Sequence, residues 1–590
     1  MKTRLLLLFL PLLALAARSV HFDVAMPEPQ THRFEVTMTL DGTRGDLTVG
    51  IPVWTPGSYL VREFARNIET IQTEDDRGRA LDIHKTDKNH WLIRAGRSRQ
   101  VKVRYRVYAF EQSVRTSFLD ADHALINGAS VFLYWEGNQD KPHSVHVELP
   151  PAWSRISTSL EPFNVQGNVD FQAANYDELV DSPMELGNHQ VLDFDVLDKP
   201  HQIALYGHHD LDESVLVQDV SAFIEAEAAI FGGLPYEHYV FIIHAGESRG
   251  GLEHANSSVN FIPRWSYADS IRYHSTISLL SHEFFHTWNI KRIAPEGLIR
   301  FDYDQETYVP ELWIVEGLTS YYDELVLVRT GFTSQQDYFG VLAKEIRSLE
   351  SRPGKNVQPV IDAGFDAWIK YYRSHADSPN STVSYYNKGH LVGLLLDILI
   401  LDATRGERSM DDVFRALYAE FYLKGRGYTS ADFQQLCERL SGLNLDAFFQ
   451  QYIYGVEPLP YADGFARLGM RLDSTSNDES YLGIRLDQSG GRTMVNHVTA
   501  RSPAWDAGIN VGDELIALDG FRVASTELDY LDVKQPGDTL SVTLSREGAL
   551  RQLPVIIGKE PDLVSGLQPD PNATPEQIRL REIWLAERIQ

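Results

Sequence analysis

The stretch Ser281-His282-Glu283-Phe284-Phe285-His286 contains two histidines four residues apart, with a glutamate directly after the first. In an α-helix, positions i and i+4 lie one turn apart on the same face, so the two imidazoles can aim at one point. That geometry suits a zinc ion, with Zn–N distances of about 2.0–2.1 Å. Glu283 would then stand where it can take a proton from an activated water. We therefore treat His282 and His286 as candidate metal ligands and Glu283 as a candidate general base.

Apolar residues around the motif predict that it lies on a buried helix. Ile277, Leu280, Phe284 and Trp288 recur at helical spacing, and neither Pro nor Gly interrupts residues 271–290. The alternative is a buried helix that carries two histidines by chance, which the motif alone does not exclude. Its surroundings are therefore needed to choose between the two.

A catalytic zinc site takes three protein ligands and leaves one position open for water. Glu316 is the best candidate for the third ligand, because a carboxylate among the apolar residues of 313–317 is costly to bury unless it meets a cation. Pro310 stands just before this segment, as at a helix start. On such a helix Thr319 and Asp323 would share the face of Glu316 and could support the ligands. The alternative is an ordinary solvated glutamate.

Length and charge limit the kind of protein that this can be. A chain of 590 residues suggests three or four domains. Its formal net charge of −28 argues against nucleic acid and anionic membrane surfaces as partners, because both demand a basic face. We interpret the acidity as a source of solubility.

The first residues are typical of an exported protein. Residues 1–4 are basic in character, residues 5–17 are apolar, and the run ends in small residues at Ala14, Ala16 and Ala17, which predicts a cleavable signal peptide. The apolar run is too short to span a membrane. Cys437 is the only cysteine, so no intrachain disulfide can form and no lipoprotein anchor is expected near the cleavage region. We expect a periplasmic or secreted protein with no stable membrane anchor.

After the signal peptide (residues 1–17), alternating apolar and polar residues predict a β-sandwich-like domain over residues 18–200. Phe34, Val36, Met38 and Leu40 form one such run. Residues 52–66, with two prolines, a glycine and clustered aromatics, suggest a rigid loop. This loop could be a packed turn or a substrate contact.

Residues 201–465 would form the domain that holds the candidate metal site, with a helical part over residues 333–454. Gly250 and Gly251 would let a substrate backbone approach closely, and Glu253 just beyond them could hold a free amino group. This signal is weak alone, because paired glycines are common in turns. Tyr386 could stabilise an oxyanion near the metal, or it could simply pack.

Residues 466–560 resemble a bacterial PDZ domain, most clearly in Tyr481-Leu482-Gly483-Ile484 and in residues 502–520. Such domains add a chain terminus to a sheet as a strand and hold its carboxylate on backbone amides of the Leu-Gly loop. The alternative is a domain that only packs against the rest of the chain. Residues 561–590 are expected to form a linker and an amphipathic helix that begins near Thr574.

Taken in order, these segments resemble the glycyl aminopeptidase family of PDZ-containing zinc peptidases, over nearly the whole mature chain. The wider relatives are membrane-alanyl-type aminopeptidases. The fold that the resemblance implies is multidomain α+β: an N-terminal β-sandwich-like domain, a thermolysin-like zinc catalytic domain with a helical extension, and a C-terminal PDZ domain. The most specific marks are Trp54-Thr55-Pro56-Gly57-Ser58-Tyr59, Gly250-Gly251-Leu252-Glu253-His254, His282-Glu283-Phe284-Phe285-His286 and Trp313-Ile314-Val315-Glu316-Gly317.

The resemblance implies an enzyme that removes the first residue from peptides with a free N-terminus. It also implies a preference for Gly or Ala as that residue. One Zn²⁺ per chain would activate the water, Glu283 would carry its proton to the leaving amine, and Glu253 would hold the free amine. The implied metal ligands are His282, His286 and Glu316, the catalytic residues Glu283 and Tyr386, and the substrate-binding residues Gly250, Gly251, Leu252 and Glu253.

Two departures from the wider relatives stand out. His254 occupies a position where they usually have Asn, and the interval between His286 and Glu316 is longer, which should place a loop of residues 291–306 near the site. Two other functions remain open: a zinc endopeptidase that does not use Glu253, and a non-catalytic PDZ-containing peptide-binding protein. The intact metal-site residues argue against the second, because a decayed site would be free to lose them.

Overall fold

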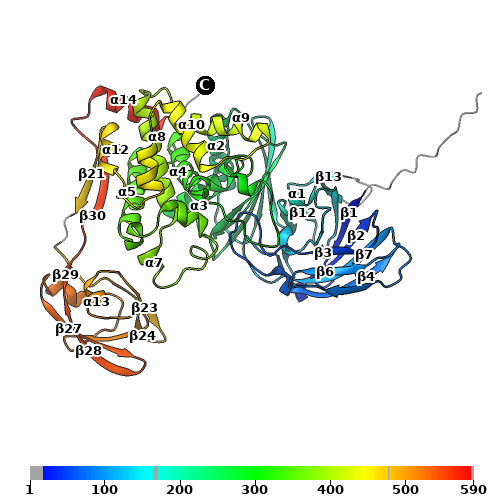
Figure 1. Ribbon diagram of the computed structural model, residues 1–590, viewed down its shortest axis with the longest axis horizontal. Coiled ribbons are helices and arrows are strands. Elements are labelled where there is room, and N and C mark those ends of the chain that lie inside the picture. Colours follow the sequence, from blue (N-terminus) through cyan, green and yellow to red (C-terminus); the bar gives the residue numbers. More distant parts are fainter. Residues whose placement is uncertain (1–17, 164–169, 476–477, 587–590) are drawn as a thin grey trace, which may run out of the picture.

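The computed structural model describes residues 18–163, 170–475 and 478–586, so the signal peptide expected at residues 1–17 lies outside the described residues. Figure 1 shows a β-rich N-terminal part in blue and cyan, a helical middle in green and yellow, and a smaller β-rich part in orange. This arrangement confirms the predicted multidomain α+β class. Within the described residues no helix is long and apolar enough to cross a membrane.

The N-terminal part is a sandwich of two sheets, as the alternation predicted. A seven-stranded sheet, in the order β13-β14-β11-β1-β2-β7-β4, shares one apolar core with the four-stranded sheet β10-β3-β6-β5. In β2, Phe34, Val36 and Met38 face this core. The strands are β1 Ser19–Ala25, β2 Arg33–Asp41, β3 Leu47–Gly50, β4 Ile68–Asp75, β5 Asp82–Lys85, β6 His90–Arg94, β7 Gln100–Tyr108, β10 Tyr134–Trp135, β11 His143–Glu148, β13 Glu161–Phe163 and β14 Asp170–Ala173, followed by helix α1 Tyr176–Val180.

A third sheet joins the N-terminal part to the middle of the chain. Its order is β12-β15-β9-β8, from Arg155–Thr158, Met184–Gly187, His123–Ile126 and Phe118–Leu119. Val114 and Phe118 from this side form one apolar cluster with Val240 and Leu252 of the next sheet. Burial of these side chains fixes the N-terminal part against the sheet that carries Glu253.

The sheet of the middle domain has the order β16-β17-β18-β20-β19. Strands β17, β18 and β20 are parallel, whereas β19 runs antiparallel to β20 at the edge of the sheet. Helix α2 (Glu213–Phe231) makes the crossover that parallel strands need. The strands are β16 Gln190–Val196, β17 Lys199–Tyr206, β18 Tyr239–Gly246, β19 Gly250–Glu253 and β20 Ser257–Pro263.

Helices cover this sheet and form the body seen at the centre of Figure 1. Two of these helices, α9 and α10, begin with capping boxes at Ser409 and Thr429. The helical elements are α3 Ser270–Phe285, η5 Trp313–Gly317, α4 Leu318–Arg329, α5 Gln335–Glu350, α6 Val360–Phe365, α7 Ser378–Ser381, α8 Tyr385–Ala403, α9 Met410–Glu420, α10 Ser430–Ser441, α11 Asp446–Phe448, η8 Phe449–Ile453 and α12 Tyr461–Arg467.

The PDZ domain has its own sheet and its own small core. Its elements are β22 Ser480–Tyr481, β23 Ile484–Ser489, β24 Arg492–Val498, α13 Pro503–Asp506, β25 Glu514–Leu518, β26 Phe521–Arg522, β27 Thr539–Arg546, β28 Ala549–Ile556 and β29 Gly558–Lys559.

Part of the segment expected to be a linker is a strand. β30 (Leu563–Pro569) pairs antiparallel with β21 (Met470–Thr475), so the chain enters and leaves the PDZ domain along one two-stranded ribbon. The sequence alone could not predict this pairing, because the whole PDZ domain separates β21 from β30 along the chain. Helix α14 (Pro575–Leu585) begins at Thr574 as predicted and returns to the helical body, where Trp584 Nε1 donates to Tyr321 Oη at 2.7 Å.

Candidate active site

Three side chains that the sequence singled out meet between α3 and η5. His282 Nε2 and His286 Nε2 lie 3.2 Å apart, and Glu316 Oε2 lies 3.5 Å from the first and 3.2 Å from the second. His282 is in the last turn of α3, and His286 is the residue that caps it. The structure therefore brings the three predicted metal ligands to one point.

The spacing of these atoms fits a metal ion. Ligand atoms about 2.0–2.1 Å from a tetrahedral zinc are about 3.3–3.4 Å from one another, close to the three distances here. Glu316 Oε2 is buried and has no hydrogen-bond partner of proper geometry. A buried carboxylate oxygen is costly to leave unpaired, so the donor set is suited to a cation. Burial acts to raise the pKa of Glu316, but the imidazoles of His286 and His282 more than offset it and hold the pKa at about 2.

The remaining nitrogen of each imidazole is held by a neighbour, which leaves both Nε2 atoms for the metal. His282 Nδ1 lies 2.9 Å from Asp323 Oδ2, and His286 Nδ1 lies 2.8 Å from the carbonyl oxygen of Asn289. Such partners fix the tautomer and orientation of metal-binding histidines. Asp323 thus takes the supporting position suggested by the sequence. Thr319, the other residue considered, does not contact a ligand but accepts a bond from Asn289.

Asn289 is a site residue that the sequence reading missed. Its side-chain amide lies 3.0 Å from the carbonyl oxygen of Ile314, 2.8 Å from that of Val315 and 3.0 Å from Thr319 Oγ1. These groups flank Glu316, so one asparagine ties the end of α3 to the turn that carries the third ligand. The only available signal was an Asn three residues after the second histidine, and nothing local gives it a role.

Glu316 does not lie on an ordinary α-helix, as the sequence had suggested. Residues 313–317 form the π-helical turn η5, which runs directly into α4. A Cβ on Gly317 would lie 2.5 Å from Gly389 Cα, and one on Gly389 would lie 2.6 Å from the carbonyl oxygen of Trp313. The two glycines therefore permit close contact between η5 and α8, which carries Tyr386.

The candidate general base faces the edge strand β19. A Cβ on Gly251 would lie 1.9 Å from Glu283 Oε1, so only glycine leaves room for the Glu283 carboxylate. Glu283 is buried, and burial raises its pKa to about 7, against the opposing effect of His282 and His286. A carboxylate with a pKa near neutrality is suited to accept and return a proton.

Glu253, at the other end of β19, is also buried beside this centre. Carboxylate oxygens of Glu253 and Glu283 and a ring nitrogen of His286 all lie within 4.8 Å of one another. Gly57, from the loop of residues 52–66, approaches it so closely that a Cβ there would lie 2.6 Å from Glu253 Oε1. The loop is largely buried, and through Gly57 it packs against Glu253, the residue expected to bind the substrate amine.

Tyr386 lies in the first turn of α8, and its ring centroid is 6.2 Å from that of His282. Burial, followed by the charge of Glu316, raises its pKa well above the usual value, so the hydroxyl keeps its proton and can donate. Tyr385 packs beside it with ring centroids 4.8 Å apart. The hydroxyls of Tyr385 and Tyr59 are buried without a hydrogen-bond partner, and Glu316 raises the pKa of both after burial does.

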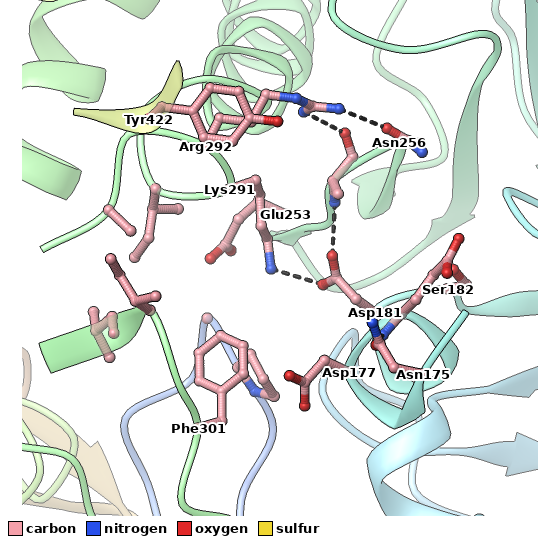
Figure 2. A pocket seen from close by; sticks show the side chains of 18 of the residues that line it. Asn175, Asp177, Asp181, Ser182, Glu253, Asn256, Lys291, Arg292, Phe301 and Tyr422 are labelled. Carbon is pink, nitrogen blue, oxygen red and sulfur yellow. Dashed lines mark hydrogen bonds and ion pairs between the residues drawn. The ribbon is translucent and has the colours of Figure 1, made fainter. Parts of the chain in front are cut away.

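A cavity of about 490 Å³ opens on the far side of Glu253. Figure 2 shows Lys291 in this cavity beside Glu253, and the Lys291 ammonium bonds Asp181 Oδ1 at 2.7 Å. His254, the departure noted in the sequence, also contacts Asp181, with Nδ1 3.0 Å from Oδ1. The loop expected near the site does line the cavity, through Lys291 and Phe301. The cavity shares Glu253 with the metal centre but none of the metal ligands.

Residues 21–188 match the Peptidase M61 N-terminal domain, residues 275–392 match M61 glycyl aminopeptidase, and residues 480–557 match a PDZ domain. No curated protein sequence matches the chain. The structure is similar to that of an aminopeptidase N family protein from Idiomarina loihiensis, with 27% identity and a TM-score of 0.89 over 96% of this chain and 100% of that one. An M1 zinc metallopeptidase from Deinococcus radiodurans is more distant, with 13% identity and a TM-score of 0.48 over 75% of this chain and 95% of that one.

Proposed function

We propose a reaction for this chain from the premise that it is a metallopeptidase with the N-terminal, catalytic and PDZ domains of the M61 glycyl aminopeptidases, as its motifs had indicated. The reaction is the zinc-dependent removal of the first residue from peptides with a free N-terminus. A preference for a small first residue, Gly or Ala, is part of the proposal; the description of the matching family supports glycine.

One observation supports an aminopeptidase over an endopeptidase. The amine of a peptide is two bonds from the carbonyl carbon of its first peptide bond. A carboxylate that holds this amine must therefore lie within about one residue of the metal site. Glu253 meets this condition, because its carboxylate lies within 4.8 Å of groups on Glu283 and His286. In an endopeptidase the preceding residue of the substrate would have to occupy the place where the Glu253 carboxylate meets the metal site.

The residues around the metal site divide the chemistry among them. His282, His286 and Glu316 would hold the Zn²⁺, which as a Lewis acid polarises the scissile carbonyl and activates water. Glu283 accepts the proton of the attacking water and passes it to the departing amine. The Tyr386 hydroxyl donates to the oxygen on which negative charge develops. Glu253 orients the substrate through a charge-assisted contact with its amine, while Gly250, Gly251 and Leu252 present the backbone of β19.

The test offers a free-amine peptide and its N-acetylated twin, each with and without a chelator. We expect chelator-sensitive cleavage of the free-amine peptide only. Equal cleavage of both peptides would favour the endopeptidase. Cleavage of neither would favour the non-catalytic binding protein.

The Glu283→Gln variant tests the general base. We expect it to bind as much zinc as the wild type and to lose about 10²- to 10⁴-fold in kcat, because the amide cannot accept a proton. Zinc content and kcat should be measured on the same preparation. Glu247→Gln, at a solvated glutamate paired with Arg264, serves as the control and should keep full activity. A Glu283→Gln enzyme with near-wild-type turnover would refute the assignment.

Two further proposals concern the ends of the chain. We propose that the protein is exported, on the strength of residues 1–17, and N-terminal sequencing of the mature protein would test it. The PDZ domain is proposed to bind a chain terminus at Tyr481–Ile484. A cavity of about 480 Å³ joins this loop to residues 350–357 of the catalytic body, so a terminus bound there would lie against both.

A further inference from the structure

Arg115 of the N-terminal part lies at the end of β19 opposite to Glu253. The position of a Cβ on Gly250, the first residue of β19, is 4.0 Å from Arg115 Nη1, and no other atom outside its chain neighbours comes that near. Gly250 and Glu253 are the first and last residues of β19, and Gly251 between them faces Glu283. A positive group and a negative group therefore stand at the two ends of this edge strand.

Arg115 has no carboxylate partner among the residues that the structure describes, although the chain carries a formal net charge of −28. None of its guanidinium atoms takes part in an ion pair or a side-chain hydrogen bond there, and its Nε is buried without a partner. A second positive charge lies near it, because burial and then Arg115 lower the pKa of Arg62. Arg115 is half-buried, with a buried, unpartnered Nε and no counter-charge, so the site favours an anion.

The anion would lie close to the tyrosines around the proposed metal site. Burial raises the pKa of Tyr372 to about 12, with Arg115 acting against this shift and Glu316 reinforcing it, so this tyrosine lies within reach of both charges. Tyr372 packs against Tyr59, whose unpartnered hydroxyl belongs to the loop that contacts Glu253. Arg115 thus lies near the tyrosines that surround the proposed metal site.

The length of β19 sets the size of the ligand. Its outer edge has no strand partner, because β19 is the last strand of the sheet, so a peptide can lie along it. From Gly250 to Glu253 the strand rises by about 10 Å, at about 3.3 Å per residue. Three extended residues of a peptide span about the same distance from amine to carboxylate.

We propose that Arg115 binds the α-carboxylate of short substrates, and that the enzyme is therefore selective for peptides of about three residues with both termini free. The proposal rests on the aminopeptidase reaction described above, because the amine must occupy Glu253 while the carboxylate reaches Arg115. The N-terminal domain would then determine, through Arg115, which length of substrate binds best.

The experiment compares an unblocked tripeptide with its C-terminal amide in the wild-type enzyme. A charge-assisted contact should favour the free acid by about 10- to 100-fold in kcat/KM. In Arg115→Gln this ratio should fall to near one, whereas Arg115→Lys should retain part of it. Cleavage of the amide by each variant reports that the enzyme is folded. Arg66→Gln is the matched control, because Arg66 is exposed and paired with Glu111 at 3.3 Å, and its ratio should equal that of the wild type.

A second series of free-acid substrates of two to six residues should show kcat/KM highest at about three and falling with length. A wild-type enzyme that cleaves acid and amide equally would overturn the proposal while leaving the aminopeptidase reaction intact. An acid preference that persists unchanged in Arg115→Gln would also overturn it. Failure to cleave any unblocked peptide would instead refute the proposed function itself.

Discussion

Asn289 joins two of the proposed metal ligands, although it touches no metal itself. Its backbone carbonyl orients the His286 imidazole, and its side-chain amide donates to two backbone carbonyls just before Glu316 and to the Thr319 hydroxyl after it. The first contact would survive a change of side chain and the second would not. Asn289 therefore sets the position of Glu316 relative to α3.

We expect Asn289→Ala to weaken metal binding by about 10- to 100-fold, as loss of an outer contact to a ligand typically does. Two backbone carbonyls would lose a donor in a buried site, which should cost about 1–3 kcal/mol of unfolding free energy. Chelator competition and thermal unfolding measure the two effects. Asn444→Ala, at an exposed asparagine, is the control. Unchanged metal affinity in Asn289→Ala would show that Glu316 is positioned in another way.

The roles of individual residues could be predicted from the sequence where those roles depend on a local pattern. His282, Glu283 and His286 follow from helical spacing, and Glu316 from a carboxylate in an apolar segment. Asn289 and Gly57 could not be predicted in the same way. Their roles depend on contacts with Glu316 and Glu253, which are distant in sequence, and an Asn or Gly in a loop has many other uses.

At the scale of elements, the π-helical turn η5 and helix α8 position the catalytic groups of the second half of the site. The sequence predicted a regular helix through Glu316, with Thr319 and Asp323 on the same face. A π-turn has an extra residue per turn, which hydropathy does not reveal, and such turns are frequent at functional sites. The close contact of Gly317 with Gly389 explains how η5 and α8 reach each other.

Gly389→Ala should force η5 and α8 apart, since its Cβ would lie 2.6 Å from the Trp313 carbonyl oxygen. We expect a loss of about 1–3 kcal/mol in stability and of about 10²-fold in kcat, because Tyr386 moves with α8. Zinc content should be less affected than kcat. The control is Gly340→Ala in α5, where nothing lies within 4 Å and alanine should stabilise the helix slightly. Equal kcat values for the two variants would contradict the proposed role of this contact.

At the scale of the molecule, the site depends on the packing of two domains. Gly57 and Tyr59 come from the N-terminal part, and the apolar cluster that contains Phe118 and Leu252 fixes that part beside β19. The sequence predicted both domains and their order. It could not predict that a loop of the first completes the site of the second, because an interface between domains leaves no periodic pattern.

The molecule should lose stability in mild acid. Burial lowers the pKa of His143, His189 and His201 to about 4 and that of His244 to about 3, from an ordinary value of 6.5. The folded state therefore disfavours their protonation, and the unfolded chain binds more protons once the pH falls below 6.5. The contribution of each buried, neutral histidine to the free energy of unfolding is present above pH 6.5 and is lost as the pH falls toward 4.

His143→Phe tests this expectation, since His143 Nε2 is buried without a partner. The variant should remove about 3 kcal/mol of the difference in unfolding free energy between pH 7 and pH 4. Denaturant unfolding at several pH values measures it. His84→Phe, at an exposed histidine, should leave the pH dependence unchanged. An identical pH profile in His143→Phe would mean that other groups govern the acid sensitivity.

The ribbon of β21 and β30 has a mechanical consequence. Because the chain goes out to the PDZ domain and comes back along paired strands, one ribbon holds both ends of the domain, and Trp584 anchors the returning chain to the helical body. Asn380 fixes the domain against that body, since its side chain donates to the Val498 carbonyl oxygen and accepts from the Ala500 backbone N–H. A chain terminus bound by the PDZ domain would therefore be held beside the catalytic body.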